Sequence, residues 1–540
     1  MIIKLILMVA IVQYTIADFN CDTICSKRNQ TRTYIFEAKY IKGAPDGYMK
    51  SIFTINGEFP GPTIYACVND TIIVTITNHG LEPTAMHWHG ILQQGTLYSD
   101  GVPGSTQCAS NIGESFTYYF HTTKPGTYWY HSHFGIQYID GLKGAIVVCD
   151  PDDPYKVSYN RSQDDVLQCT DWYHSNATYL YNLYLSNALH GAEPIPESCL
   201  INNFGQPPDC HAKKTCGYYR TEIKAGISKR IRVINTSAFA VLMCTIDGHR
   251  MRLIEADGTY LNGKTYVNVL TFNAGQRYSF IIDGKTNPKQ NYWIRCNMDT
   301  PYLNGPSAQP TVRGILVYDT KFGLPPDAQF NDSEHVIQGA LARANRFIDQ
   351  NLVPMKGRCN CPKKSTRKIF LELAFVFSNN GALLPIMNHH AFKAVANTTI
   401  LSLIQTNISS FPASANVFTI EKGEVIDLYI NSEIGQHPMH LHGHVFCVMG
   451  IGKVGSGFSD ASNVDLNTDN PICRDTASIL FEGWMVLRFV ADNPGVWMFH
   501  CHIDWHLGAG LALQFIESPN AIRKIYGTAQ KPVECKMDRK

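Results

Sequence analysis

The sequence contains an internal repeat, and this repeat limits the folds that the chain can adopt. Residues 124–148, KPGTYWYHSHFGIQYIDGLKGAIVV, align with residues 493–515, NPGVWMFHCHIDWHLGAGLALQF. Both copies place a Pro-Gly turn before an aromatic strand and end in a Gly-rich return to an apolar strand. Each is preceded by a matching segment, EPTAMHWHGI or GQHPMHLHGH, and residues 287–299 repeat the aromatic strand without histidines. We therefore expect three successive β-sandwich domains, with histidine motifs in the outer two only.

Short alternating runs elsewhere also predict strands. TIIVTITN, KRIRVINT, RYSFIIDG and EVIDLYIN are separated by Gly, Pro and Asn turns, and long helical periodicity is scarce. A chain of 540 residues is long enough for three domains with separate cores. We place these domains at residues 18–155, 156–345 and 346–540 of an all-β, monomeric protein. The formal net charge of +1 gives no indication of a nucleic acid or an acidic membrane surface as partner.

The N-terminus has the features of a secretory signal peptide. Residues 1–17 contain one lysine, a short apolar run and small residues before a cleavage point after Ala17. The apolar run is too short to cross a bilayer, and a buried N-terminal strand or an anchor is the alternative. The 17 cysteines agree with an oxidising compartment, so we predict a soluble, extracellular protein. Eight Asn-x-Ser/Thr sequons are compatible with glycosylation: Asn29, Asn69, Asn160, Asn176, Asn235, Asn331, Asn397 and Asn407.

Four His-x-His pairs occur at matching positions of the repeat. In a β-strand, residues i and i+2 point to the same face, so the two imidazoles of each pair lie together. A single pair is more often a surface or core feature, but four pairs in matching places supply eight imidazoles. If the outer domains face each other, these eight can bind a cluster of several metal ions. The pairs are His87 and His89, His131 and His133, His440 and His442, and His500 and His502.

A cysteine lies between the two histidines of the last pair. Cys501 must point away from His500 and His502, and on that side it can meet His506 and His437. Two imidazoles and one thiolate form the trigonal set that suits a blue copper centre. The peptide around Cys501 would then carry electrons from this copper to the histidine cluster. Zinc could use the same ligands in a structural site but would gain nothing from the arrangement.

These motifs resemble those of the multicopper oxidases, a family that includes laccases, ferroxidases and ascorbate oxidases. HWHG, HSH, HPMHLHGH and HCHIDWHLGAGL appear in family order across nearly the whole chain after residue 17. The resemblance implies three consecutive cupredoxin-like Greek-key β-sandwich domains. It also implies four copper ions per chain and four one-electron oxidations of a donor, coupled to reduction of dioxygen to two waters. The implied ligands are His437, Cys501 and His506 for the blue (type 1) copper, His87 and His440 for type 2, and two type 3 sets, His89, His131 and His502, and His133, His442 and His500.

Three further residues receive roles from the resemblance. Leu511, ten residues after the cysteine, occupies the axial position and cannot coordinate, which predicts a higher reduction potential than a methionine would give. Asp100 matches an acid that moves protons near the type 2 copper, although an aspartate beside a glycine also suits a plain turn. Asp504 either has a role similar to that of Asp100, beside the metal ligands, or is a solvated turn residue.

The sequence identifies the electron donor less clearly than it identifies the metals. Secretion and Leu511 favour a laccase-like oxidase of phenols and aromatic amines. The alternative is a ferroxidase that oxidises Fe(II), because GAEPIP (191–196) resembles a stretch of fungal ferroxidases whose glutamate, here Glu193, helps bind iron. An ordinary Pro-bounded loop would look the same. A non-catalytic copper-binding protein is a weaker hypothesis, since storage would not need the thiol between the histidines.

The cysteines other than Cys501 could form up to eight disulfides. Resemblance to fungal laccases implies that Cys108 pairs with Cys535. The remaining pairings stay open. Histidines outside the motifs, such as His249 and His444, receive no role.

Overall fold

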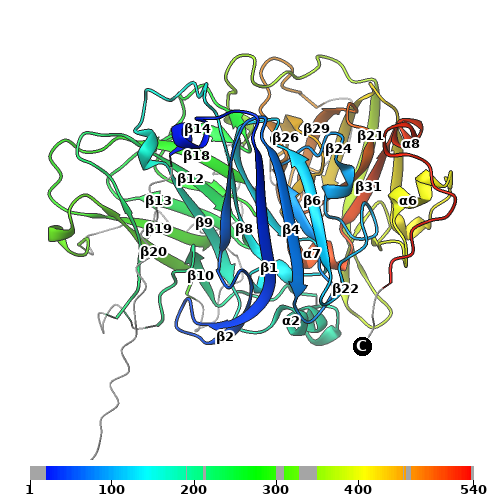
Figure 1. The fold of residues 1–540 in the computed structure, drawn as a ribbon, viewed down its shortest axis with the longest axis horizontal. Helices are drawn as coiled ribbons and strands as arrows, with labels where there is room; N and C mark the ends of the chain where they lie inside the picture. The colour runs from blue at the N-terminus through cyan, green and yellow to red at the C-terminus, as the bar shows by residue number, and fades with distance from the viewer. Residues whose placement is uncertain are drawn as a thin grey trace, which may run out of the picture.

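The computed structural model describes residues 20–189, 191–208, 210, 215–299, 309–326, 349–433, 435–453, 455–457 and 464–536. The predicted signal peptide, residues 1–17, and the sequon at Asn331 lie outside these ranges. Strands form three pairs of sheets that follow one another along the chain, as predicted from the repeat. In Figure 1 the first pair, in blue, lies between the green second pair and the yellow-to-red third pair.

The first sandwich packs two four-stranded sheets, ordered β2-β1-β4-β6 and β3-β8-β7-β5. The apolar side of TIIVTITN in β4 faces the core, because every second residue of that strand is buried. The strands are β1 (Thr31–Gly43), β2 (Lys50–Ile55), β3 (Gly61–Cys67), β4 (Thr71–His79), β5 (Met86–His89), β6 (Ser115–His121), β7 (Gly126–Ser132) and β8 (Lys143–Cys149).

The second sandwich has a larger sheet, β10-β9-β12-β18-β14-β15 with β16 paired to β14, and a smaller one, β11-β20-β19-β13-β17. KRIRVINT and RYSFIIDG form β12 and β18, which pair antiparallel. The strands are β9 (Asp165–Trp172), β10 (Ser198–Ile201), β11 (Tyr219–Glu222), β12 (Lys229–Asn235), β13 (Val241–Ile246), β14 (Met251–Ala256), β15 (Thr259–Tyr260), β16 (Tyr266–Val267), β17 (Leu270–Phe272), β18 (Arg277–Ile282), β19 (Tyr292–Asp299) and β20 (Thr311–Val317).

The third sandwich joins the sheets β22-β21-β24-β29-β26-β27 and β23-β31-β30-β25-β28. Its strands are β21 (Arg367–Phe377), β22 (Leu383–Met387), β23 (Val417–Ile420), β24 (Val425–Ser432), β25 (His437–Leu441), β26 (Phe446–Ile451), β27 (Cys473–Arg474), β28 (Thr476–Ile479), β29 (Trp484–Val490), β30 (Gly495–Cys501) and β31 (Ala512–Glu517).

The described helices are short. The α-helices are α1 (Cys21–Ile24), α2 (Ala177–Tyr184), α6 (Ile400–Gln405), α7 (Asp504–Ala509) and α8 (Pro519–Tyr526). The 3₁₀ turns are η1 (Leu97–Ser99), η2 (Gln137–Asp140), η3 (Arg161–Gln163), η4 (Asn187–Leu189), η5 (Thr320–Phe322), η6 (Asp349–Asn351) and η7 (Ala413–Ala415). Within the described ranges, no helix has the length and apolar character that a membrane span requires.

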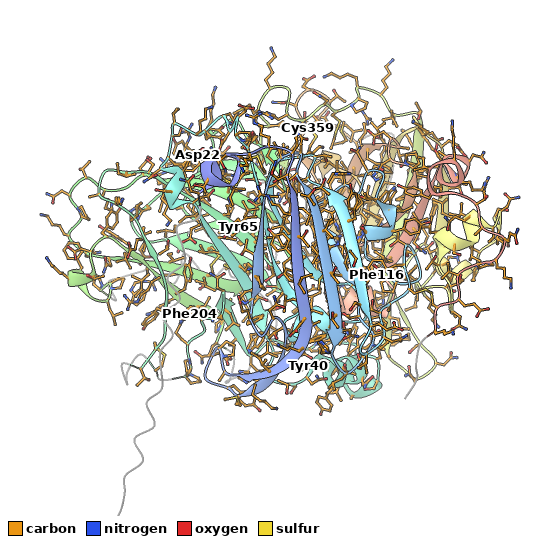
Figure 2. The ribbon with its side chains drawn as sticks, in the orientation of Figure 1. Asp22, Tyr40, Tyr65, Phe116, Phe204 and Cys359 are labelled. Carbon is orange, nitrogen blue, oxygen red and sulfur yellow. A yellow bond between two sulfur atoms is a disulfide. The ribbon has the colours of Figure 1, made fainter. Side chains whose placement is uncertain are left out.

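Side chains fill the spaces between the sheets and between the sandwiches (Figure 2). One apolar cluster contains Trp129 of β7, Ile231 of β12 and Phe499 of β30, so it connects all three sandwiches. The sandwiches therefore pack against one another through shared core side chains. The boundary between the first and the third is consequently a buried place in which polar side chains must find partners.

Seven disulfides join fourteen of the cysteines, one fewer than the maximum of eight. Cys108 pairs with Cys535, as the family resemblance implies. Cys169 and Cys199 remain free because the β9–β10 register pairs Cys199 with Asp171 and Cys169 with Ile201, which leaves the two thiols diagonal to each other. The other disulfides are Cys21–Cys149, Cys25–Cys67, Cys210–Cys216, Cys244–Cys296, Cys359–Cys473 and Cys361–Cys447.

The sequons differ in exposure, and this difference predicts where glycans can be attached. Asn29, Asn397 and Asn407 are exposed, whereas Asn235 is buried and donates its side-chain N–H groups to Ala240 O and Phe272 O, both at 3.0 Å. We expect peptide mass spectrometry of protein secreted from a eukaryotic host to find glycan at exposed sequons and unmodified Asn235. A glycan on Asn235 would contradict the described core, because the amide cannot keep both bonds and carry a sugar.

Candidate metal centres

Four strands place the predicted histidine pairs next to one another. In the first sandwich, His87 of β5 lies directly opposite His131 of β7. In the third sandwich, His440 of β25 lies directly opposite His500 of β30. Both outer domains therefore present their pairs from two adjacent antiparallel strands, as the matching motifs of the repeat indicate.

The eight imidazoles meet where the first and third sandwiches pack together. His89 Nδ1 lies 3.1 Å from His502 Nε2 across this boundary, and the rings of His87 and His442 stack with centroids 3.9 Å apart. His442 Nε2 lies 3.1 Å from His500 Nε2. Groups with ligand atoms mutually within 4.8 Å include His87, His440 and His442; His87, His89 and His131; and His133, His442 and His500. The predicted convergence of the four pairs is present.

The ring nitrogen that points away from the centre is held by an oxygen atom in most of these histidines. His87 Nδ1 donates to Asp100 O at 2.7 Å, and His440 Nδ1 donates to Asp475 O at 2.8 Å. His500 Nδ1 donates to Cys501 O at 2.8 Å. A carbonyl oxygen only accepts, so the proton lies on Nδ1 and the lone pair of Nε2 points into the centre.

The inward nitrogens are the kind of atoms that a metal ion requires. The Nε2 atoms of His87, His131, His133 and His440 are buried and have no hydrogen-bond partner among the described residues. Burial lowers the pKa of His500 to about 4, so this ring stays neutral at pH 7. The same direction holds, with neighbouring imidazoles as a further cause, for His89, His131, His133, His440, His442 and His502. Buried, neutral, unpartnered imidazoles fit metal ligands.

A second group lies on the other side of the segment 500–502. The sulfur of Cys501 is 3.5 Å from His437 Nδ1 and 3.6 Å from His506 Nδ1. His506 comes from α7, which begins three residues after Cys501. Burial raises the pKa of the Cys501 thiol far above its usual value, so a thiolate here needs a cation beside it. Leu511 is fully buried, and its carbonyl accepts from the Cys501 N–H at 3.1 Å.

Glu193 reaches this second group directly. Its Oε1 atom lies 2.7 Å from His506 Nε2, and its side chain retains 17% exposure. Burial acts to raise the pKa of Glu193, but the hydrogen bond and the charge of His506 outweigh it and the pKa is lowered. Glu193 therefore lies between solvent and a ring that faces Cys501, in contrast to an ordinary loop glutamate.

The two aspartates selected from the sequence are both buried. Asp100 Oδ2 accepts from His442 Nδ1 at 2.9 Å, in addition to the bond from His87 to the Asp100 main chain. One residue thus holds a histidine from each outer sandwich. Asp504 begins α7 and is 2% exposed, and burial raises its pKa well above the usual value. The reading of Asp504 as a solvated turn residue is therefore wrong.

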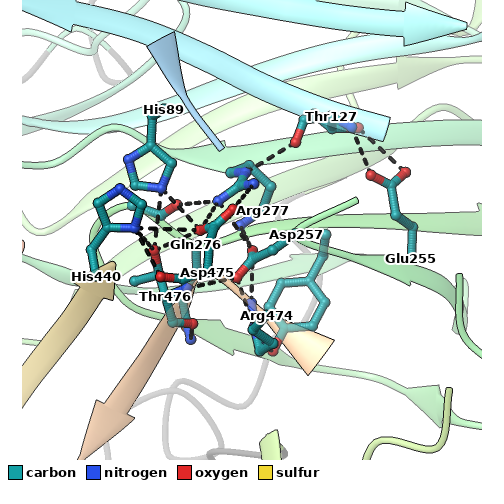
Figure 3. A network of polar contacts seen from close by, with 12 residues as sticks. His89, Thr127, Glu255, Asp257, Gln276, Arg277, His440, Arg474, Asp475 and Thr476 are labelled. Atoms are coloured by element: carbon teal, nitrogen blue, oxygen red, sulfur yellow. Dashed lines mark hydrogen bonds and ion pairs between the residues drawn. The ribbon is translucent and has the colours of Figure 1, made fainter. Parts of the chain in front are cut away.

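Asp475 contacts the cluster and Arg277 contacts Asp475, although no sequence motif marks either residue. Asp475 Oδ1 accepts from His89 Nε2 at 3.1 Å, and Arg277 donates to both carboxylate oxygens at 2.6 Å (Figure 3). Neither residue belongs to a His or Cys motif, and 198 positions separate them. A buried strand arginine before a Tyr, and an Arg-Asp dipeptide, were the only local signals available.

Comparison with known proteins agrees with this geometry. Three family profiles described as multicopper oxidase match residues 37–153, 163–321 and 383–521. The iron transport multicopper oxidase FET3 of Gibberella zeae is 32% identical over 510 residues, covering 92% of this chain and 78% of that protein. Laccase-1 of Cryptococcus neoformans var. neoformans is 31% identical over 514 residues, covering 91% of this chain and 81% of that protein.

A solved structure extends the comparison to the fold. The crystal structure of Fet3p, titled a multicopper oxidase that functions in iron import, aligns with a TM-score of 0.81. It is 27% identical and covers 94% of this chain and 97% of that chain. The prediction of three consecutive cupredoxin-like β-sandwich domains is confirmed.

Proposed function

The chain belongs to the multicopper oxidase family, and from this premise we propose that it is a laccase-like oxidase of phenols and aromatic amines that reduces dioxygen to water. The observation that carries the proposal is the segment 500–502. His500 and His502 join the imidazole cluster, while Cys501, one peptide bond from each, faces His437 and His506. The two candidate centres are thus covalently adjacent, which suits electron transfer from one to the other.

We assign four copper ions to these residues. His437, Cys501 and His506 would hold the type 1 ion, and His87 and His440 the type 2 ion. The type 3 ions would be held by His89, His131 and His502, and by His133, His442 and His500. Copper supplies the one-electron couples needed to take four electrons from donor molecules and pass them to one dioxygen, which also takes up four protons.

The chain's own residues then have separate tasks. The Asp100 carboxylate holds His442 and lies in the cluster's wall, where it can pass protons toward reduced oxygen. Seven of the eight histidines are buried, which keeps bulk water away from most of the cluster. Leu511 has no donor atom to offer the metal beside Cys501, which favours a high reduction potential and the oxidation of phenols.

Fe(II) is the second candidate donor. Glu193 is the observation that favours it, because a carboxylate at 2.7 Å from His506 could hold a cation next to the ring through which electrons enter. Phenols remain our choice, since one carboxylate is a poor iron site and the same carboxylate can accept a phenol's proton. The copper-storage alternative does not explain why Cys501 links two ligand groups.

We place the protein outside the cell. Seven disulfides support this placement, because such bonds persist in oxidising compartments.

Copper content tests the ligand assignment. Purified protein should hold about four copper ions per chain by elemental analysis and should be blue. Cys501→Ser should remove the blue absorption and all turnover, because the thiolate is both ligand and electron path. His131→Ala should keep the blue absorption, since His131 does not contact Cys501, but should stop oxygen consumption. A colourless wild type that holds only zinc would refute the copper assignment.

Asp100 can be tested without disturbing the ring that it holds. Asn at position 100 keeps an oxygen that accepts from His442 Nδ1 but cannot donate a carboxyl proton. We expect Asp100→Asn to slow oxygen consumption increasingly as the pH rises, because proton supply falls with proton concentration. The measurement is the kcat of oxygen consumption against pH at saturating donor. An Asp100→Asn profile parallel to the wild type would limit Asp100 to holding His442.

The donor is tested at Glu193. The kcat/KM values for Fe(II) and for a dimethoxyphenol are compared in wild type, Glu193→Ala and Glu193→Gln. Gln keeps an oxygen that accepts from His506 Nε2, so it separates loss of charge from loss of the hydrogen bond. We expect good phenol oxidation by the wild type and no selective loss for iron in Glu193→Gln. A selective loss for Fe(II) of about 10-fold or more, equivalent to roughly 1.4 kcal/mol, would instead indicate a ferroxidase.

A further inference from the structure

The middle sandwich supplies none of the cluster's eight imidazoles, yet one of its turns touches the cluster. This turn, Asn273–Arg277, connects β17 to β18. We propose that it is the positioning element of the oxygen-reducing centre: Arg277 orients His89 and His440 through Asp475, and Gly275 sets the place of the His502 ring. The inference rests on the proposed function, because it concerns residues assigned there as copper ligands.

Arg277 connects all three sandwiches through one buried side chain. Its guanidinium donates to both carboxylate oxygens of Asp475 in the third sandwich, each at 2.6 Å. Its Nε–H donates to Thr127 O at 3.0 Å, at the start of the strand that carries His131. The side chain is 0% exposed, so these contacts are not shared with solvent. A planar fork that makes two parallel bonds fixes the orientation of Asp475 as well as its position.

Asp475 in turn holds two histidines from opposite sides of the domain boundary. Its main-chain oxygen accepts from His440 Nδ1 at 2.8 Å, which leaves Nε2 of that ring free. Its Oδ1 atom accepts from His89 Nε2 at 3.1 Å, so Nδ1 of that ring faces the cluster, 3.1 Å from His502 Nε2. His89 therefore uses the ring nitrogen opposite to the one that His440 uses. Because Asp475 selects which nitrogen carries the proton, it also selects which nitrogen faces the cluster.

Gly275 acts on the cluster by shape. Its backbone has φ +83°, and a Cβ built there would lie 2.7 Å from Cδ2 and 3.0 Å from Cγ of His502. Such distances are shorter than a carbon–carbon contact allows, so any side chain at 275 must displace the ring. Gln276 adds a third contact, since its Nε2 donates to Thr476 O at 3.1 Å, next to Asp475. Three successive residues of one turn therefore make these contacts: Gly275 with His502, Gln276 with Thr476, and Arg277 with Asp475.

The turn itself is anchored by a chain of buried charges (Figure 3). The Asp257 carboxylate accepts from the main-chain N–H of Arg277 at 2.8 Å. Arg474, the neighbour of Asp475, donates to both oxygens of Asp257 at 2.8 and 2.9 Å. The middle and third sandwiches are therefore joined by two alternating Arg–Asp pairs around the turn. This arrangement fixes the position of Asp475 from both ends.

Two variants disturb the turn by different means, and each has a matched control. Gly275→Ala adds a methyl group against His502, whereas Gly226→Ala places the same methyl at a similar φ of +71° in the same sandwich, with Thr286 Cγ2 3.9 Å away. Arg277→Lys removes the fork that holds Asp475. Arg488→Lys removes a comparable buried fork, bonded to Asp427 at 2.6 and 2.8 Å.

The measurements are copper per chain after dialysis against a chelator, blue absorption per chain, and the Tm of the metal-free protein. We expect both turn variants to fall from about four copper ions to about one and to keep the blue absorption, because Cys501, His437 and His506 form the other ligand group. The control variants should keep all their copper, even where their metal-free Tm falls as far. Asp475→Asn, which keeps the shape of the side chain but loses its charge, should show the same selective loss as Arg277→Lys.

Other outcomes separate the two proposals. A wild type without copper would overturn the proposed function. A copper-loaded wild type whose turn variants keep all their copper would overturn only the positioning role. The positioning role would also fail if blue absorption and total copper declined together, in step with Tm and equally in the controls, because a merely structural turn would act in that way.

Discussion

The two-residue period of an extended strand at residues 500–502 is the constraint on which the rest of the structure depends. It sends His500 and His502 to one side and Cys501 to the other, so two ligand groups form one peptide bond apart. Pairing with β25 then places His440 opposite His500 and Met439 opposite Cys501. A shift of one residue in this register would exchange the two sides and destroy both groups at once.

Burying the imidazole cluster costs free energy of folding, which the rest of the structure must offset. Eight imidazoles meet in a buried space, where several inward nitrogens lack partners among the described residues. Unpaired buried polar atoms typically cost about 1–3 kcal/mol each, and metal binding removes that cost. The outward nitrogens are satisfied instead by fixed oxygens, such as the carbonyls of Asp100 and Asp475. The rings are therefore oriented by the fold before any ion arrives.

The sequence predicted the features that depend on the alternation of residues within one strand. It missed the features that depend on contacts between segments far apart in the chain. The four histidine pairs and the opposed Cys501 follow from alternation within short segments, and the three sandwiches follow from the repeat. Arg277 and Asp475 could not be paired in this way, because their contact exists only after two sandwiches dock. The sequence left Asp504 open between a supporting role and a solvated turn for the same reason. Its main-chain N–H, at the start of α7, donates to Ala238 O in the middle sandwich, a contact that only docking creates. The sequence could not show that Cys169 and Cys199 remain free, because this depends on the register between β9 and β10.

The middle sandwich contacts both ligand groups, although it supplies none of the proposed copper ligands. One of its loops brings Glu193 to His506, and one of its turns brings Gly275 to His502 and Arg277 to Asp475. It thus meets both ligand groups through two separate segments, of which one is partly exposed and the other is buried. Under the proposed function, a change in the partly exposed loop would alter the surroundings of His506, where electrons would enter. Loops commonly carry specificity, so in the proposed function this loop is where the choice of donor would be set, apart from the buried turn at the cluster.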